Sequence, residues 1–303
     1  MSASNRTAVI TGANAGIGFE AALKLAEKGT NILMACRSLD KAKQARVELL
    51  SRVPRANIEI LPLDVSEPKS IKEFTERFAE QVGALDILIN NAGIVTPLLS
   101  RNSLGYELHL ATNYLGAFAL TGMLLPYFRK GAPTRIVNVG SLAHRFGKFD
   151  FDDPNWDKTT YNNWKAYARS KIATASFTIE LNRRLQQNGG GTIALAAHPG
   201  FAATDMGRKS GATTPKSKFG RWYQGKMEAW IVAKPEHAAD PIIHAASADD
   251  VGGGDYYGPT GLFEIKGKTG KAKLNPLARD VDFGRRLWNA SESLTGVSYL
   301  SGL

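Results

Sequence analysis

Residues 11–18 read Thr-Gly-Ala-Asn-Ala-Gly-Ile-Gly, and this stretch decides the fold. It follows a short apolar run at 8–10 that predicts a strand, and it leads into a helical pattern at 18–28. Glycines between a strand and a helix let a phosphate approach the backbone, and the N–H groups at the helix start bind that anion. A turn without a ligand is the alternative, but the flanking strand and helix favour a dinucleotide phosphate loop.

Short β-branched runs alternate with longer helical patterns along most of the chain. This alternation predicts βαβ units and a parallel sheet wound with helices on both faces. The expected strands are 8–10, 31–36, 58–63, 87–89, 135–139 and 192–197, and the expected helices are 18–28, 40–52, 68–82, 104–129 and 164–187. We expect Asp40 to cap the second helix and Pro68 to open the third.

The pattern weakens after the sixth expected strand, where Gly, Ala, Thr, Lys and Ser dominate. We expect a substrate lid at about 200–234, with a plain surface insertion as the alternative. A helix opened by Pro235, a strand at 262–265 and an amphipathic helix at 277–293 follow. No linker divides the sequence, so we expect one domain over 1–303 with a C-terminal extension at about 266–303.

Composition limits the class of protein. The chain has 303 residues, 43% of them hydrophobic, which fits a globular α/β domain. We expect no membrane span and a cytoplasmic location, because the start lacks a signal-peptide pattern and one cysteine cannot form an internal disulfide. The five histidines include no closely spaced pair, so we expect no metal site.

The net charge of +10 raises the question of nucleic-acid binding. No helix-turn-helix pattern or aromatic-rich RNA-binding motif accompanies the basic residues, many of which lie late in the chain. We therefore interpret the charge as solvated surface that attracts an anionic cofactor, and we expect no nucleic-acid partner.

The end of the second strand predicts which cofactor binds. An acidic residue there binds the ribose 2′-hydroxyl of NAD, whereas a cation accommodates the 2′-phosphate of NADP. This sequence has Cys36-Arg37-Ser38 and no carboxylate at the strand end. Arg37 can form paired hydrogen bonds with a phosphate, with Ser38 and Lys41 as helpers. The charge pattern therefore predicts NADP(H) in preference to NAD(H).

Polar and glycine-rich residues also follow the third and fourth strands. They are Asp64 and Val65 after the third, and Asn91, Ala92 and Gly93 after the fourth. Asp64 could be a simple turn or cap residue, and the second segment could be a turn whose glycine takes a positive φ. Because both lie at the edge that holds the phosphate loop, we favour contact with the cofactor.

Tyr167 and Lys171 lie four residues apart in an expected helix, so they share one face. A tyrosine can donate a proton to a carbonyl oxygen if nearby positive charge lowers its pKa from about 10. We expect Lys171 to supply that charge. The pair alone is weak evidence, because this spacing arises by chance on many helices.

Two further residues strengthen the catalytic interpretation. Ser141 follows the fifth strand, where its hydroxyl can hydrogen-bond a substrate carbonyl; a helix or turn cap is its alternative role. Asn113 lies inside a long apolar helix, although asparagine is a poor helix former. A core amide satisfied by the backbone is the alternative there.

Together these motifs resemble the short-chain dehydrogenase/reductase family over residues 7–204. The Gly-x-x-x-Gly-x-Gly spacing is similar to the family's glycine loop, and Asn113, Ser141, Tyr167 and Lys171 match its catalytic tetrad. The resemblance implies a Rossmann-type doubly wound sheet of about seven strands. It also implies that Asn113 holds a water that links Lys171 to solvent. The cofactor-binding residues carried over are Gly12, Asn14, Gly16, Ile17, Gly18, Arg37, Ser38, Lys41, Asp64, Val65, Asn91, Ala92, Gly93, Tyr167, Lys171, Pro199, Gly200 and Thr204.

Within the family, Ala-Cys-Arg at 35–37 and the late run at 276–292 resemble the branch of retinol dehydrogenases and protochlorophyllide reductases. The interval from Ser141 to Tyr167 is longer than in the commonest members. We expect the chain to lack the membrane anchor of many retinol dehydrogenases, so a retinoid substrate does not follow from the resemblance. The family often forms homo-oligomers, but the C-terminal extension could cover one of the usual interfaces.

The sequence thus predicts an NADP(H)-dependent oxidoreductase that moves hydride between the nicotinamide and a carbonyl or alcohol, with Tyr167 as proton donor or acceptor. Aromatic residues in the expected lid favour a fairly apolar ketone or aldehyde, with a place in the core or in an oligomer interface as their alternative role. The alternative is a non-catalytic NADP(H) sensor or scaffold on the same fold.

Overall fold

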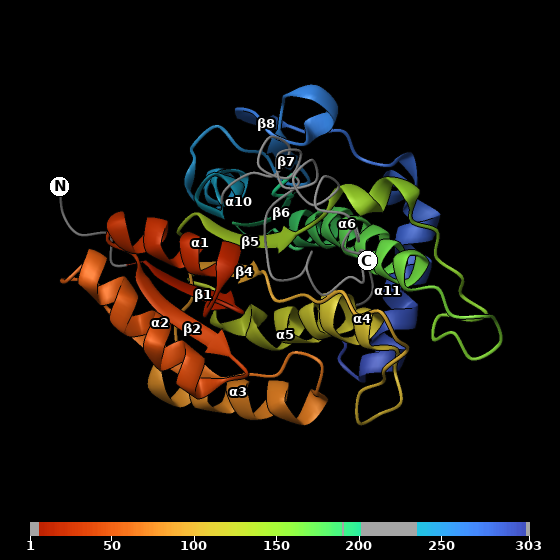
Figure 1. Cartoon of the computed structure of the whole chain (residues 1–303), viewed down its shortest axis with the longest axis horizontal. Coiled ribbons are helices and arrows are strands. Elements are labelled where there is room, and N and C mark those ends of the chain that lie inside the picture. Colours follow the sequence, from red (N-terminus) through yellow and green to blue (C-terminus); the bar gives the residue numbers. More distant parts are fainter. Residues whose placement is uncertain (1–5, 190, 201–234, 301–303) are drawn as a thin grey trace, which may run out of the picture.

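One eight-stranded sheet runs through the computed structural model, which describes residues 6–189, 191–200 and 235–300 (Figure 1). The strand order is β3-β2-β1-β4-β5-β6-β7-β8, and all neighbours pair in parallel except β8, which is antiparallel to β7. The strands are β1 (Thr7–Thr11), β2 (Asn31–Cys36), β3 (Ile58–Pro62), β4 (Ile87–Asn90), β5 (Thr134–Val139), β6 (Thr192–Ala197), β7 (Tyr256–Pro259) and β8 (Thr269–Lys271). The predicted Rossmann-type architecture is confirmed.

The central strands are mostly apolar because helices cover both of their faces. In β1, Val9 packs into one hydrophobic core, whereas Ala8 and Ile10 pack into the other. The strand order reverses between β1 and β4, and open sheets of this kind bind ligands at the carboxyl ends of the strands on either side of that reversal.

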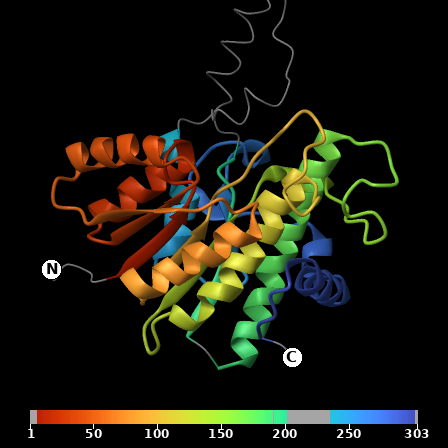
Figure 2. The same cartoon turned by 90° about the horizontal axis from the view of Figure 1, so that it is seen from below.

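One face of the sheet carries α3 (Pro68–Gln81), a long composite helix and α6 (Asn163–Gln187), which lie side by side (Figure 2). The composite helix consists of α4 (Leu108–Leu110), the π-helical turn η1 (Ala111–Leu115), α5 (Gly116–Leu124) and the 3-10 turn η2 (Leu125–Tyr127). The opposite face carries α1 (Gly16–Glu27), α2 (Leu39–Arg52) and α10 (Asp240–Ser247), with α9 (Pro235–Ala238) beside α1. The helices that bear Asn113 and Tyr167 therefore share one face.

The C-terminal extension packs against the face formed by α5 and α6. It contains the 3-10 turn η5 (Pro276–Arg279) and α11 (Val281–Thr295), which is capped by Asp280. Trp288 of α11 is buried, and its ring lies 5.0 Å from that of Phe118 and 6.0 Å from that of Phe177 between centroids. The extension is thus part of the main core.

Several predicted boundaries were wrong for identifiable reasons. The long helix begins at Leu108 instead of 104, because Glu107 caps it there. The N-cap of α2 is Ser38, and Asp40 lies in the first turn, where its charge favours the helix dipole. Residues 262–264 form a 3-10 turn, η4 (Leu262–Glu264), and the strands lie on either side of it. The final helix begins four residues late because Pro276 opens the separate turn η5.

One helix in the described part of the chain, Leu108–Tyr127, is long and apolar enough to cross a membrane by composition. This finding stands against the expectation of no membrane span. However, 78% of its most apolar window is buried inside the domain, as in the core helix of a soluble protein, so the segment is weak evidence for a span.

Candidate active site

The glycine turn between β1 and α1 is built around close backbone contacts. Gly12 and Gly16 take positive φ values of 67° and 55°, which favour glycine. At Gly18, a Cβ atom would lie 2.4 Å from Nδ2 of Asn91 and 2.5 Å from the carbonyl oxygen of Gly12. Only glycine fits at these positions without displacing the turn.

Contacts with the segment after β4 hold this turn in place. Nδ2 of Asn91 donates to the carbonyl oxygen of Thr11 at 2.8 Å, and the backbone N–H groups of Asn91 and Ala92 both donate to Thr11 Oγ1 at 2.9 Å. The Asn91 side chain therefore supports the glycine turn. Sequence reasoning missed Thr11, although its place at the end of β1 was a usable signal.

The start of α1 fits a pyrophosphate. The N-cap, Ala15, provides no side-chain hydrogen bond, and the first turn of the helix carries no acidic residue. The N–H groups at this end are thus open to an anion that approaches over Gly16, Ile17 and Gly18. Within the described residues the Asn14 side chain forms no hydrogen bond. Asn14 remains a predicted cofactor contact.

Two cationic side chains, those of Arg37 and Lys41, lie near the end of β2. The Arg37 side chain is 74% exposed, and its Nη1 lies 3.4 Å from Oδ2 of Asp64. Ser38 and Lys41 are exposed beside it at the start of α2. Cys36, by contrast, is buried, and burial raises the pKa of its thiol to about 11, so it stays protonated at neutral pH.

Asp64 is first of all a turn residue. Its Oδ1 accepts hydrogen bonds from the backbone N–H of Ser66 at 3.0 Å and from the Ser66 hydroxyl at 2.6 Å. Val65 is buried, and a Cβ at Gly116 would lie 1.9 Å from its carbonyl oxygen, so this turn packs directly on α5. Asp64 therefore acts as a turn residue, which is the alternative role considered from the sequence. Its Oδ2 also faces Arg37, at the edge of the sheet where the cofactor is expected.

Tyr167 of α6 and Ser141 at the end of β5 lie at the same edge of the sheet, close enough for Ser141 to influence the Tyr167 pKa. Ser141 also caps the 3-10 turn η3 (Leu142–Phe146), because its Oγ accepts from the N–H of Ala143 at 3.2 Å. Burial raises the pKa of Tyr167, and the nearby Ser141 hydroxyl opposes that rise. The expected lowering of the Tyr167 pKa by Lys171 is not observed.

Lys171 lies one helical turn from Tyr167 and is buried. Its Nζ donates to the carbonyl oxygen of Val139 at 2.9 Å and lies 5.8 Å from the centroid of the Tyr167 ring. Burial lowers the pKa of Lys171 to about 8, because the charged ammonium is poorly solvated there. The ammonium is thus fixed beside the phenol but is not bonded to it.

Asn113 lies in the π-helical turn η1 and is fully hydrogen-bonded by protein groups. Its Oδ1 accepts from the N–H of Ile94 at 2.8 Å, and its Nδ2 donates to the Ile94 carbonyl at 3.1 Å and to Ser170 Oγ at 3.0 Å. The Asn113 side chain therefore links the segment after β4 to α6. This is the alternative role considered from the sequence, that of a buried amide whose hydrogen bonds are made within the core. Ser170, missed from sequence, in turn donates to the Tyr167 carbonyl at 2.7 Å.

The backbone after β6 makes close contacts with neighbouring segments as far as Gly200. Gly200 has a φ of 71°, and a Cβ there would lie 2.2 Å from the carbonyl oxygen of Ile265. Its N–H donates to Nδ1 of the buried His198 at 3.1 Å, and this bond places Pro199 at the carboxyl edge of the sheet. Thr204 and the expected lid over 201–234 lie outside the described residues.

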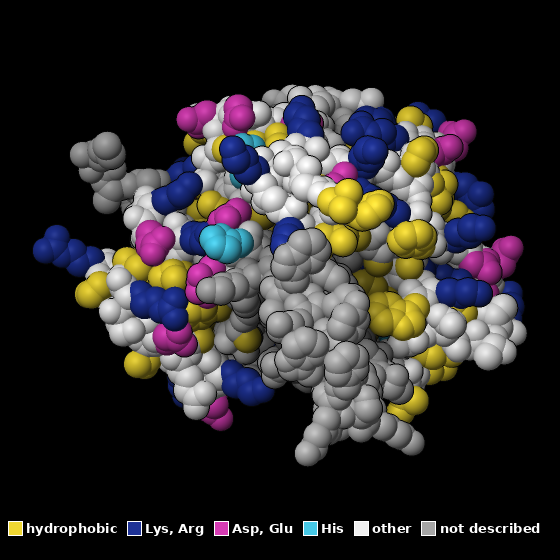
Figure 3. Space-filling model, turned by 45° about the horizontal axis from the view of Figure 1, so that its top comes forward, with side chains coloured by type: hydrophobic (Ala, Val, Ile, Leu, Met, Phe, Trp, Pro, Cys, Tyr) yellow, Lys and Arg dark blue, Asp and Glu magenta, His cyan; other side chains and the backbone are white. Residues whose placement is uncertain are grey.

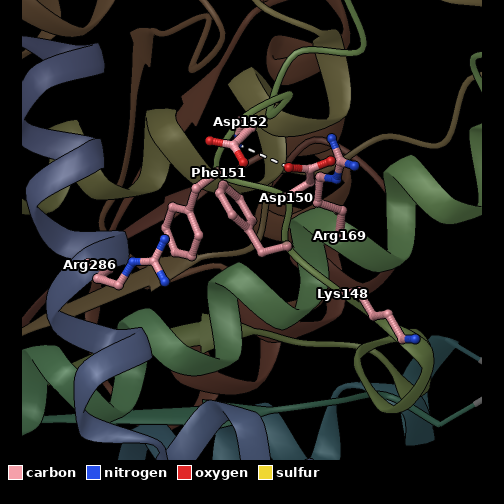
Figure 4. Close-up of a pocket in the computed structure, with 7 residues that line it drawn as sticks. Lys148, Asp150, Phe151, Asp152, Arg169 and Arg286 are labelled. Atoms are coloured by element: carbon pink, nitrogen blue, oxygen red, sulfur yellow. Dashed lines mark hydrogen bonds between the residues drawn. The ribbon is translucent and has the colours of Figure 1, made fainter. Parts of the chain in front are cut away.

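The long interval between Ser141 and Tyr167 lies against α6 and α11. Figure 4 shows Arg286 from α11 reaching Phe151, with the guanidinium carbon 4.3 Å from the ring centroid. An open groove of about 490 Å³ lies here, lined by Lys148, Phe149, Asp150, Phe151, Asp152, Arg169 and Arg286. The inserted residues are therefore anchored beside the helix that carries Tyr167.

The face shown in Figure 3 mixes charges of both signs. Lys and Arg side chains are interspersed there with Asp and Glu, and no continuous basic stripe crosses its described part. Such a surface is what we expect of solvated charge.

The glycine turn after β1 lies beside the segment that follows β4. Ser141, Tyr167 and Lys171 lie at the same edge of the sheet. This arrangement defines a nicotinamide-dependent dehydrogenase site. The sequence profile described as short chain dehydrogenase matches residues 6–215. The chain belongs to the short-chain dehydrogenase/reductase family, and within it to the retinol dehydrogenase branch. It is an oxidoreductase that acts on an alcohol or carbonyl group with NAD(P).

The relatives cover nearly all of the chain. Retinol dehydrogenase 13 from Homo sapiens is 39% identical over 96% of this chain and 85% of its own length. Retinol dehydrogenase 12 from Bos taurus is 36% identical over 97% and 87%. A crystal structure of an uncharacterized protein from Mycobacterium paratuberculosis is 34% identical, with a TM-score of 0.79 over 98% of this chain and 95% of its own.

A second solved structure carries a cofactor. It is described as an NAD(P)-dependent gluconate 5-dehydrogenase from Beutenbergia cavernae with bound NADP at low occupancy. It is 25% identical, with a TM-score of 0.63 over 84% of this chain and 94% of that one.

Proposed function

We propose that this protein is an NADP(H)-preferring reductase of an apolar ketone or aldehyde, with alcohol oxidation as the reverse reaction and Tyr167 as proton donor or acceptor. The observation that carries the proposal is the placement of the Ser141 hydroxyl and the buried Lys171 ammonium beside Tyr167. Three groups able to handle a carbonyl oxygen and its proton thus meet at one sheet edge.

The preference for NADP(H) rests on the charge at the end of β2. Arg37 and Lys41 are exposed there, and the nearby carboxylate of Asp64 shares its charge with Arg37 and with the Ser66 turn. A 2′-phosphate would meet a guanidinium and an ammonium, whereas a 2′-hydroxyl would find no carboxylate on β2 itself. The bound NADP in the Beutenbergia structure is consistent with this preference.

The nicotinamide, when bound, supplies or accepts the hydride. The protein's own part is to manage the proton at the substrate oxygen. Because burial raises its pKa, Tyr167 is protonated at neutral pH and can donate to that oxygen during reduction. The Ser141 hydroxyl holds the same oxygen, and the Lys171 ammonium stabilises the phenolate that remains.

Exposed apolar groups near this edge support an apolar substrate. Phe146 of η3 is 83% exposed, and Leu262 and Phe263 of η4 are 79% and 72% exposed. An ion pair between Arg145 and Glu264 joins these two turns, so their apolar side chains belong to one region. A long-chain or retinoid-like aldehyde fits both this surface and the names of the curated relatives.

A spectrophotometric screen tests the function directly. We expect purified protein to oxidise NADPH faster than NADH in the presence of apolar aldehydes or ketones, retinal among them. Tight NADPH binding without turnover across a broad carbonyl panel would instead support a cofactor sensor or scaffold. The cytoplasmic location and the oligomeric state stay predictions.

A further inference from the structure

A buried carboxylate and imidazole lie behind Tyr167, outside the catalytic tetrad. Glu107 caps α4 and is 1% exposed, and His109 two residues later is fully buried. Oε1 of Glu107 lies 2.6 Å from Nδ1 of His109, and the hydroxyl of Tyr161 donates to the same oxygen at 3.1 Å. We call Glu107, His109 and Tyr161 the Glu107 cluster.

Hydrogen bonds determine the protonation of His109. The backbone N–H of Thr96 donates to Nε2 at 3.0 Å, so Nε2 carries no proton. The ring proton is therefore on Nδ1, which donates it to Glu107. The imidazole is neutral, and both of its nitrogens are held by partners, so the ring has one orientation.

That ring contacts the catalytic tyrosine. The centroids of His109 and Tyr167 are 6.1 Å apart, and the rings meet edge to face at 65°. Thr96, on the other side of His109, belongs to the segment that begins with Asn91 and supports the glycine turn. One side chain therefore spans from the cofactor-loop segment to the proton donor.

The inserted residues before α6 complete the arrangement. Asn155 accepts a hydrogen bond from the N–H of Glu107, and its Nδ2 donates to the carbonyl of Gly105 at 3.0 Å. Trp156 packs on Tyr161 with 5.6 Å between ring centroids. The insertion thus closes over the carboxylate and brings Tyr161 to it.

Helix capping alone does not explain this carboxylate. A short polar side chain would cap α4 at less desolvation cost than a buried glutamate. Besides the N–H groups of His109 and Leu110, Glu107 binds two side chains, those of His109 and Tyr161. One of these two contacts Tyr167.

We propose that the Glu107 cluster is a positioning device that holds the Tyr167 ring at a set distance from the cofactor-loop segment, and so sets the path of the transferred proton. Its members touch neither substrate nor cofactor in this proposal, which rests on the proposed function. Small displacements of a reacting group slow an enzyme strongly. We therefore expect substitutions in the Glu107 cluster to lower kcat.

Two variants and a matched control test the inference. His109→Phe keeps a ring beside Tyr167 but loses the bonds to Glu107 and Thr96, and Tyr161→Phe removes only one hydroxyl. Thr134→Val is the control, because its bond to Thr192 Oγ1 is equally buried but lies at the amino ends of β5 and β6, far from the site. For each protein we would measure kcat, the NADPH Kd, the solvent deuterium isotope effect on kcat and Tm.

We expect His109→Phe to lower kcat by about 10–100-fold, with the NADPH Kd within about threefold of wild type and a larger solvent isotope effect. Tyr161→Phe should lower kcat by about 2–10-fold, in line with one lost hydrogen bond. Thr134→Val should lower Tm and leave kcat and the isotope effect unchanged.

The outcomes separate the two proposals. If the wild type turns over a carbonyl and neither variant loses more kcat than Thr134→Val, the positioning role is wrong and the function stands. If the wild type turns over no carbonyl, the proposed function fails and this inference fails with it. Should His109→Phe not fold, the kcat and isotope effect of Tyr161→Phe decide the question.

Discussion

The ammonium of Lys171 donates a 2.9 Å hydrogen bond to the carbonyl oxygen of Val139. Val139 is the last residue of β5, directly before the Gly140-Ser141 pair, so this bond ties α6 to the strand that presents the catalytic serine. The Lys171 ammonium is therefore held at a set distance from the Tyr167 ring, and the Ser141 hydroxyl lies near the same tyrosine.

The charge of Lys171 predicts a pH dependence of carbonyl reduction. Burial lowers its pKa to about 8, so the ammonium is charged below that pH and neutral above it. Tyr167, whose pKa is raised, keeps its proton through the same range. We expect kcat/KM for reduction to be level below about pH 8 and to fall above it. A profile that stays level well past this point would show that the lysine charge does not assist the proton transfer.

Tyr167→Phe tests the proton donor. The variant keeps the ring and its packing against His109 but cannot donate a proton, so we expect turnover to fall by about 100- to 10,000-fold. NADPH binding, followed by its fluorescence, should remain close to wild type because the glycine turn is unchanged. Full activity in this variant is incompatible with the assigned role.

Arg37→Asp tests the cofactor preference. The new carboxylate would repel a 2′-phosphate and accept a hydrogen bond from a 2′-hydroxyl, so we expect a shift from NADPH towards NADH in kcat/KM. Arg46→Asp makes the same charge change at an exposed position farther along α2 and serves as the control. An unaltered ratio in Arg37→Asp, or an equal shift in the control, counts against phosphate recognition by Arg37.

Gly18→Ala tests the close packing of the phosphate loop. The added methyl would lie 2.5 Å from the backbone oxygen of Gly12, which cannot move away without opening the turn. We expect NADPH binding to weaken strongly and Tm to fall. In Gly191→Ala the nearest atom, the carbonyl oxygen of Ala132, lies at an ordinary 3.6 Å, so this variant should behave as wild type. Equal NADPH affinity in both variants would contradict the packing argument.

Trp288→Ala tests whether the C-terminal extension stabilises the domain. The buried indole contacts Phe118 and Phe177, and truncation of such a side chain costs about 3–5 kcal/mol. Urea unfolding should show this loss in the free energy of unfolding, whereas Val281→Ala, at a half-exposed site on the same helix, should change it little. A small effect of Trp288→Ala would mean that α11 contributes little to the core.

Local patterns were enough to predict the parallel sheet, the glycine turn and the placement of Ser141 and Tyr167 at one edge. A parallel sheet places every strand end at one edge, so motifs that follow strands come together whatever their separation in sequence. The same reasoning failed at residues 262–264, where a short apolar run was taken as a strand. In the structure Phe263 has a φ of 54° there, because the run forms a turn between two strands.

The sequence by itself determined the fold, the family and the four residues offered as catalytic, because each depends on a residue type at a defined place beside a strand or helix. The tertiary structure alone decided how those residues are held. Asn113 binds Ile94 and Ser170, burial raises the Tyr167 pKa, and His109 lies between Thr96 and Tyr167. These properties arise from contacts and desolvation between remote segments, which no local pattern of residues encodes.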